Sequence, residues 1–113
     1  MNNKNEIDND ETLQEKLQEI KNQEGIIGYI LRSSNSAAID LKDPQKIIDY
    51  AVLSSAVLDV SNDITEKLQV GEVETAILES DETKLLSMKI GNNHLSIFME
   101  QTIDHNKLCK KLK

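Results

Sequence analysis

The chain has 113 residues, which suits one domain, and its 20 acidic and 13 basic side chains give a formal net charge of −7. A negative field of this size repels phosphate backbones and anionic lipids, so it disfavours nucleic acids and membrane surfaces as partners. Trp is absent and only two Tyr and one Phe are present, so the core must be aliphatic, and the single Cys excludes an internal disulfide.

The first predicted element is a helix from Glu11 to Gln23. Residues 1–9 contain one apolar residue after the initiator, so they are predicted to be a disordered lead-in to a single domain over residues 10–113. The apolar stripe of the helix repeats at four- and three-residue spacing: Leu13, Leu17 and Ile20.

Two short strands are predicted next. Residues 26–31 are apolar on both faces, which is typical of a central strand covered on both sides. The polar turn 32–36 leads into a second strand over residues 37–41, so the pair is predicted to form a hairpin. Gly25 and Gly28 are interpreted as structural, because a Walker loop has another spacing and a dinucleotide-binding loop lies between a strand and a helix.

A long helix is predicted from Pro44 to about Gln69, with Asp43 as its cap and Gly71 as its stop. It has two apolar faces. One face runs its whole length: Tyr50, Leu53, Val57, Val60, Ile64 and Leu68. The other occupies its first half: Ile47, Ile48, Ala51, Val52, Ser55 and Leu58. One face must cover the sheet of the domain. The other is either a partner surface or is covered by a terminal helix.

The rest of the chain is predicted to form a three-stranded meander and a C-terminal helix: strands 73–80, 83–90 and 94–100, and helix 104–112. Residues 81–82 and 91–93 are the tight turns between these strands. The predicted element order is therefore α-β-β-α-β-β-β-α.

Three stretches of the sequence define this element order: a short amphipathic helix before EGIIGYILRSS, a long helix ending in LQVGE, and VETAILESDETKLLSMKIGNNHLSIFME. Over residues 11–112 it resembles the roadblock family of dynein light chains and small-GTPase regulators. The turn at Asn35-Ser36 lacks the glycine usual in that family, and the last helix, DHNKLCKKLK, is shorter and poorer in arginine.

The resemblance implies an α/β fold of the profilin-like type. It is a three-layer α/β/α sandwich with a five-stranded antiparallel sheet, the long helix on one face and the terminal helices on the other. It also implies a homodimer, or pairing with a sister roadblock-type subunit, through strand 73–80 and the long helices. An unpaired edge strand is an independent reason to expect a dimer. The predicted interface combines the second helix face with the edge strand: Ile47, Ile48, Ala51, Val52, Ser55, Leu58, Val73, Thr75, Ile77 and Glu79.

The sequence offers little catalytic or metal-binding chemistry, so neither an enzyme, a cofactor nor a metal is predicted. His105 and Cys109 share a spacing that could suit a metal, but zinc needs three or four ligands and His94 is the only other histidine. Asp59 and Asp63 are interpreted as a solvated helix face. Arg32, the single arginine, could be an arginine finger, but it is interpreted as a surface residue.

The leading hypothesis is a non-enzymatic, dimeric regulator or scaffold that binds a Ras-like small GTPase and modulates its nucleotide cycle or localisation. The alternative is a structural adaptor, a light-chain-like subunit of a larger motor or scaffold complex, whose binding ignores nucleotide. A third interpretation, a small-molecule sensor, needs a cavity with polar groups that the sequence does not indicate. We expect a cytoplasmic protein, because the sequence lacks a signal peptide and an apolar run long enough for a membrane span.

Overall fold

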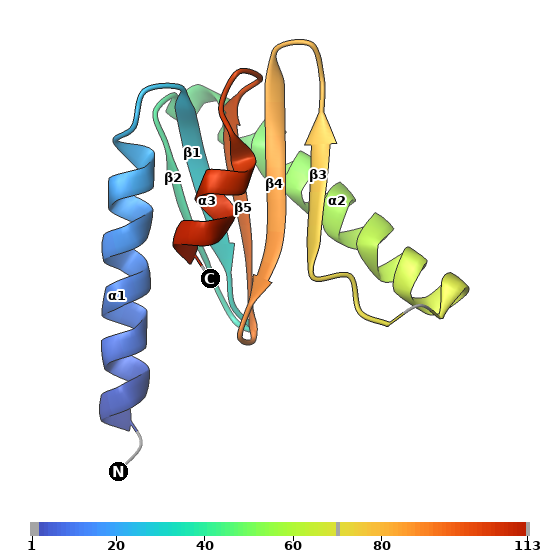
Figure 1. The fold of residues 1–113 in the computed structure, drawn as a ribbon, viewed down its shortest axis with the longest axis horizontal. Coiled ribbons are helices and arrows are strands. Elements are labelled where there is room, and N and C mark those ends of the chain that lie inside the picture. Colours follow the sequence, from blue (N-terminus) through green and yellow to red (C-terminus); the bar gives the residue numbers. More distant parts are fainter. Residues whose placement is uncertain (1–2, 70, 113) are drawn as a thin grey trace.

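A five-stranded antiparallel sheet with the strand order β2-β1-β5-β4-β3 forms the middle layer of the molecule (Figure 1). The computed structural model describes residues 3–69 and 71–112, with the side chains of residues 12–69 and 71–112. The strands are β1 (Ile26–Arg32), β2 (Ala37–Leu41), β3 (Thr75–Glu79), β4 (Thr83–Ile90) and β5 (Asn93–Glu100). The predicted element order and the three-layer α/β architecture are confirmed.

Helix α2 (Ile47–Leu68) crosses one face of the sheet, while α1 (Asn3–Lys21) and α3 (His105–Leu112) lie on the other (Figure 1). A 3-10 turn over Pro44–Lys46 precedes α2, and the Asp43 carboxylate accepts the Gln45 N–H at 3.1 Å, so Asp43 caps this turn. The α-helix itself begins at Ile47 instead of at the predicted Pro44. Gln69 ends α2 in the left-handed conformation, with φ of 50°.

Helix α1 begins at Asn3 rather than at the predicted Glu11, and it ends at Lys21 rather than Gln23. Residues 3–10 contain neither proline nor glycine, so no local breaker stops the helix from continuing toward the N-terminus. The domain boundary at residue 10 stays a prediction, and residues 1 and 2 of the predicted lead-in lie outside the described residues.

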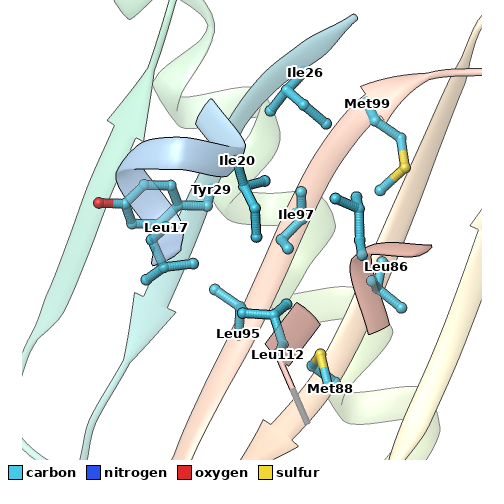
Figure 2. Close-up of a cluster of buried hydrophobic side chains, with 11 residues drawn as sticks. Leu17, Ile20, Ile26, Tyr29, Leu86, Met88, Leu95, Ile97, Met99 and Leu112 are labelled. Atoms are coloured by element: carbon cyan, nitrogen blue, oxygen red, sulfur yellow. The ribbon is translucent and has the colours of Figure 1, made fainter. Parts of the chain in front are cut away.

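The larger hydrophobic core lies between the sheet and the two terminal helices (Figure 2). Leu17 and Ile20 of α1 are fully buried, which confirms the predicted stripe, and Leu13 packs beside them half-buried. The buried members of this core are Leu17, Ile20, Ile26, Tyr29, Leu86, Met88, Leu95, Ile97, Met99, Leu108 and Leu112. This core attaches both helices to the same face of the sheet.

A second core lies between the sheet and α2. Its buried members are Ile30, Leu41, Leu85 and Phe98. The residues of α2 that pack against it come from both predicted faces: Ile47, Tyr50, Ala51, Leu53 and Val57. The Tyr50 and Phe98 rings meet with centroids 4.5 Å apart. Neither predicted face alone meets the sheet, because α2 crosses the strands obliquely and its C-terminal part extends beyond β3 (Figure 1).

At Gly28 the backbone of β1 comes too close to β2 for any side chain. A β-carbon at this position would collide with the Asp40 carbonyl oxygen and the Leu41 side chain. Gly25 has a φ of 88°, a left-handed conformation that glycine adopts without strain. Both glycines therefore serve backbone geometry at the entry to β1, as the sequence predicted.

Candidate partner interface

An apolar ridge, which we call the α2 ridge, runs along the solvent side of α2. Every fourth residue belongs to it and is exposed: Ile48, Val52, Ala56, Val60, Ile64 and Leu68. Ile48, Val52 and Leu68 keep 76, 64 and 64% of their surface exposed. Residues four apart are neighbours on a helix, so these side chains form one continuous row of the kind that packs into a groove of another helix.

Strand β3 provides a free sheet edge close to this ridge. The Lys89 N–H donates to the Glu74 carbonyl oxygen at 3.0 Å, and the Ser80 N–H donates to the Thr83 carbonyl oxygen at 2.9 Å. Because hydrogen-bonded pairs alternate along an antiparallel ladder, the backbone groups of Thr75, Ile77 and Glu79 face away from β4. These are the three β3 residues that the sequence predicted for the interface.

The two faces of β3 each expose one large apolar side chain. Ile77 pairs with Leu86 of the larger core, so it lies on the side of α1 and α3 and is 36% exposed. Leu78 pairs with Leu85 of the second core, so it lies on the side of α2 and is 42% exposed. A strand added to this edge would cover apolar surface on both faces of the sheet.

The remaining predicted interface residues differ in how exposed they are. Ile48 and Val52 lie on the α2 ridge, but Ile47 and Ala51 pack half-buried against the second core. Among the others, Ser55 accepts a hydrogen bond from Arg32, Leu58 is half-buried, and the Val73 N–H donates to Thr65 Oγ1 at 3.2 Å. The interface itself stays a prediction.

The predicted interface misses four residues of the α2 ridge: Ala56, Val60, Ile64 and Leu68. The sequence analysis assigns Val60, Ile64 and Leu68 to the apolar face that runs the whole length of the helix. It does not distinguish the residues of that face that the sheet covers from those that stay exposed. The signal that could have found them is the unbroken spacing of four from Ile48 to Leu68.

Arg32 is held within the domain instead of standing free on the surface. Its Nη2 donates to the Ala51 carbonyl oxygen at 3.2 Å and to Ser55 Oγ at 3.0 Å. Its Nε is buried and has no hydrogen-bond partner among the described residues. The guanidinium thus links the end of β1 to the first half of α2, and the predicted surface position is only partly correct because the side chain is half-buried.

Small polar side chains lie where α2 packs on the middle of the sheet. The hydroxyls of Ser54 and Ser96 are 2.7 Å apart and both residues are fully buried. Nearby, Ser87 Oγ and His94 Nε2 are 2.6 Å apart. Serine is small, so α2 can approach the strands closely here, and each buried hydroxyl still has a hydrogen-bond partner.

Acidification is expected to weaken the fold through His94. Burial, and then the neighbouring Arg32 charge, lower the pKa of His94 below its ordinary value of 6.5. The unfolded chain then binds a proton that the folded chain does not, so the contribution of His94 to stability is constant well above pH 6.5 and falls as the pH drops through this value. The slope for one proton is at most about 1.4 kcal/mol per pH unit.

Urea unfolding between pH 7 and pH 5 measures this effect. The variant His94→Gln is expected to lose most of the pH dependence in this window, whereas the matched variant His105→Gln is expected to keep it. If the free energy of unfolding changed equally with pH in the wild type and in His94→Gln, His94 would not be the source of the pH dependence.

The candidate metal ligands are not brought together. His94 lies on the α2 side of β5, whereas His105 and Cys109 belong to α3 on the opposite face. Within residues 3–69 and 71–112, no group of three His, Cys, Asp or Glu side chains could hold a metal ion. No helix in the described part of the chain is long and apolar enough to cross a bilayer.

A hollow of about 720 Å³ opens at the end of the sheet where β1 and β4 begin. Its wall includes charged side chains from several elements, among them Lys42, Lys46, Asp81 and Glu82. Such a wall differs from the apolar lining with a few polar groups that is typical of small-molecule sites, so nothing here favours the sensor interpretation.

No protein-family model matches the chain, and no curated protein matches it in sequence. Solved structures do match it. A roadblock/LC7 domain from Streptomyces avermitilis aligns with a TM-score of 0.67 and 16% identity, over 89% of this chain and 85% of that one. The gliding protein MglB from Thermus thermophilus aligns with a TM-score of 0.66 and 15% identity, over 89% and 80%. MglC from Myxococcus xanthus aligns with a TM-score of 0.50 and 16% identity, over 89% and 90%.

Proposed function

Because the chain has the roadblock/LC7 fold, we propose that it is a non-enzymatic, dimeric regulator or scaffold that binds a Ras-like small GTPase. The observation that carries the dimer is the α2 ridge together with the free edge of β3. The GTPase is proposed from the resemblance to a family that includes small-GTPase regulators, and the structural likeness to the gliding protein MglB is in keeping with it.

In the proposed dimer, β3 pairs with β3 of a second copy around a two-fold axis at Ile77. Thr75 of one copy then lies opposite Glu79 of the other, and the outward backbone groups of both strands are satisfied. The C-terminal part of α2 reaches beyond β3, so the two helices would pack along Val60, Ile64 and Leu68. A sister subunit with the same fold could replace the second copy.

The position of Arg32 supports a particular mode of action. Its guanidinium is bound to Ala51 and Ser55 of its own domain, so it is not offered to a nucleotide on another protein. A regulator of this kind would act by holding the switch segments of the GTPase in one arrangement instead of supplying an arginine finger.

A binding titration tests the GTPase proposal. The Ras-like GTPase encoded nearest to this gene is loaded with GDP or with a non-hydrolysable GTP analogue, and its affinity for the protein is measured by calorimetry. We expect tighter binding of the triphosphate form, by at least about tenfold or 1.4 kcal/mol.

The GDP-loaded GTPase is the matched control, because it differs only in the γ-phosphate and the switch segments that contact it. Equal affinity for both forms would favour the adaptor alternative, a subunit of a larger motor or scaffold complex. If the protein bound neither form, the proposal that this GTPase is its partner would be wrong. The proposed dimer would then be tested separately.

A further inference from the structure

The sheet has a second free edge, β2, at the end opposite to β3. The Ser33 N–H donates to the Ser36 carbonyl oxygen at 2.8 Å, and the Lys42 N–H donates to the Ile27 carbonyl oxygen at 2.9 Å. These bonds fix the alternation of the ladder between β1 and β2. The backbone N–H and C=O groups of the alternate residues therefore point away from β1: Ala37, Ile39 and Leu41.

The β2 edge is short, with five residues, but it carries no lysine, proline or bulge of the kind that prevents strand addition. Stable proteins protect such edges with lysine, proline, a bulge or an inward-pointing charge. Strand β2 reads AAIDL, pairs with β1 without a break in register, and leaves Ala37, Ala38 and Ile39 exposed. Its one charged residue, Asp40, is bound by Lys21 and therefore does not repel an incoming strand.

The surroundings of β2 favour a basic occupant. The Gln18 side chain of α1 reaches Asp40 at 3.3 Å, and Glu15 and Glu19 are exposed beside Gln18 on the same helix. Asp43 is exposed just beyond the end of β2, whereas Lys42 is bound to the Gln23 carbonyl oxygen at 3.1 Å. The α1 side of the edge thus presents carboxylates, while the α2 side presents the apolar Ile39.

A second copy of the chain is a poor occupant for β2. The α1 side of this edge presents carboxylates, and a second copy of β2 carries Asp40 and no basic residue, so it offers no opposite charge to them. A protein that self-pairs through both β3 and β2 would also form an open-ended chain of sheets instead of a closed assembly.

We propose that β2 binds an extended segment of another protein by strand addition, and that this segment alternates apolar and basic residues. The apolar residues would lie on the side of Ile39, and the basic residues on the side of Glu15 and Glu19. The proposal does not depend on the partner being a GTPase, although the exclusion of a second copy uses the dimer proposed at β3.

Amide hydrogen exchange measured by NMR tests the proposal with a synthetic probe, the capped heptapeptide Lys-Val-Lys-Val-Lys-Val-Lys. In the free protein, Ala38 and Asp40 should exchange slowly because they bond to β1, and Ala37, Ile39 and Leu41 should exchange fast. Saturating peptide is expected to slow the exchange of the second group by at least about tenfold. The matched control peptide carries N-methyl groups on alternate amides and should not slow it.

The variant Ile39→Pro removes an outward N–H without removing a bond to β1, so it should fold and yet lose the effect of the peptide. The variant Ile39→Val should still show slower exchange at β2 when the peptide is added. The proposal would be overturned if the peptide left amide exchange at β2 unchanged, or if it slowed exchange at Thr75, Ile77 and Glu79 instead. It would also be overturned if the peptide slowed exchange in Ile39→Pro as much as in the wild type. Slow exchange of Ile39 in the free protein, with a mass above that of a dimer, would show self-pairing and overturn it too.

Discussion

The substitution Ile64→Asp is expected to convert the proposed dimer into monomers while leaving the domain folded. Ile64 lies on the α2 ridge and is 39% exposed in the single chain, so a carboxylate at this position can reach water in the monomer. In the dimer, the same carboxylate would lose its water against an apolar surface of the other copy. We expect the dissociation constant of the dimer to rise by a factor of at least about 100, or 2.7 kcal/mol.

Sedimentation velocity over a concentration series measures the change, and far-UV circular dichroism shows whether the helices persist. The matched control is Asn62→Asp, which places the same side chain two positions away on the same helix, outside the ridge. A dimer in Ile64→Asp as tight as in the control would move the interface away from the C-terminal part of α2.

The position of Ala51 decides how the N-terminal part of this helix should be tested. A substitution such as Ala51→Glu would suit the sequence-based prediction, in which Ala51 faces a partner. In the structure Ala51 packs against the second core, so a glutamate there would damage the fold before it reported on any interface. Val52→Asp is the better probe, because Val52 is 64% exposed.

The substitution Phe98→Ala is expected to cost about 3–5 kcal/mol of unfolding free energy. Phe98 is the only phenylalanine of the chain and is fully buried beneath α2. Its ring contacts that of Tyr50, with centroids 4.5 Å apart and planes tilted by 50°. Removing its ring leaves a cavity in the second core, and the cost depends on how far the partly buried residues of α2 around it can move into the space. Domains are stable by about 5–15 kcal/mol, so this loss is a large fraction of the total.

Equilibrium unfolding in urea measures the loss as a lower midpoint at an unchanged slope. Phe98→Leu is the matched control, since it keeps an apolar side chain of similar volume and should cost less than about 1.5 kcal/mol. A loss in Phe98→Ala no greater than in Phe98→Leu would show that α2 is not held by this core.

Elements with a strong local pattern were predictable from the sequence. Asp43-Pro44 marks the start of the long helix, and the turns at 81–82 and 91–93 divide the meander, because capping and turn preferences act within a few residues. The core positions of Leu17 and Ile20 were predictable because the part of a helix that lies on a sheet buries one stripe of side chains against it.

The division of α2 into covered and exposed surfaces was not predictable from its periodicity. Tyr50 and Ile64 belong to one apolar face in the sequence, yet Tyr50 packs on Phe98 and Ile64 is exposed. The angle between the helix and the strands decides this difference, and that angle depends on tertiary contacts such as the one between Ser54 and Ser96. Likewise, the inward hydrogen bonds of Arg32 depend on a helix that is distant in sequence.

The reach of α2 beyond β3 has a consequence for how the protein would behave in the cell. The last turns of this helix carry apolar side chains but lie past the edge of their own sheet (Figure 1). In the proposed dimer, the other copy would cover them, so the exposure of these apolar side chains would follow mass action. The amount of chain present would then set how much of this apolar surface faces water, and dilution alone would leave the folded monomer with a sticky helix end.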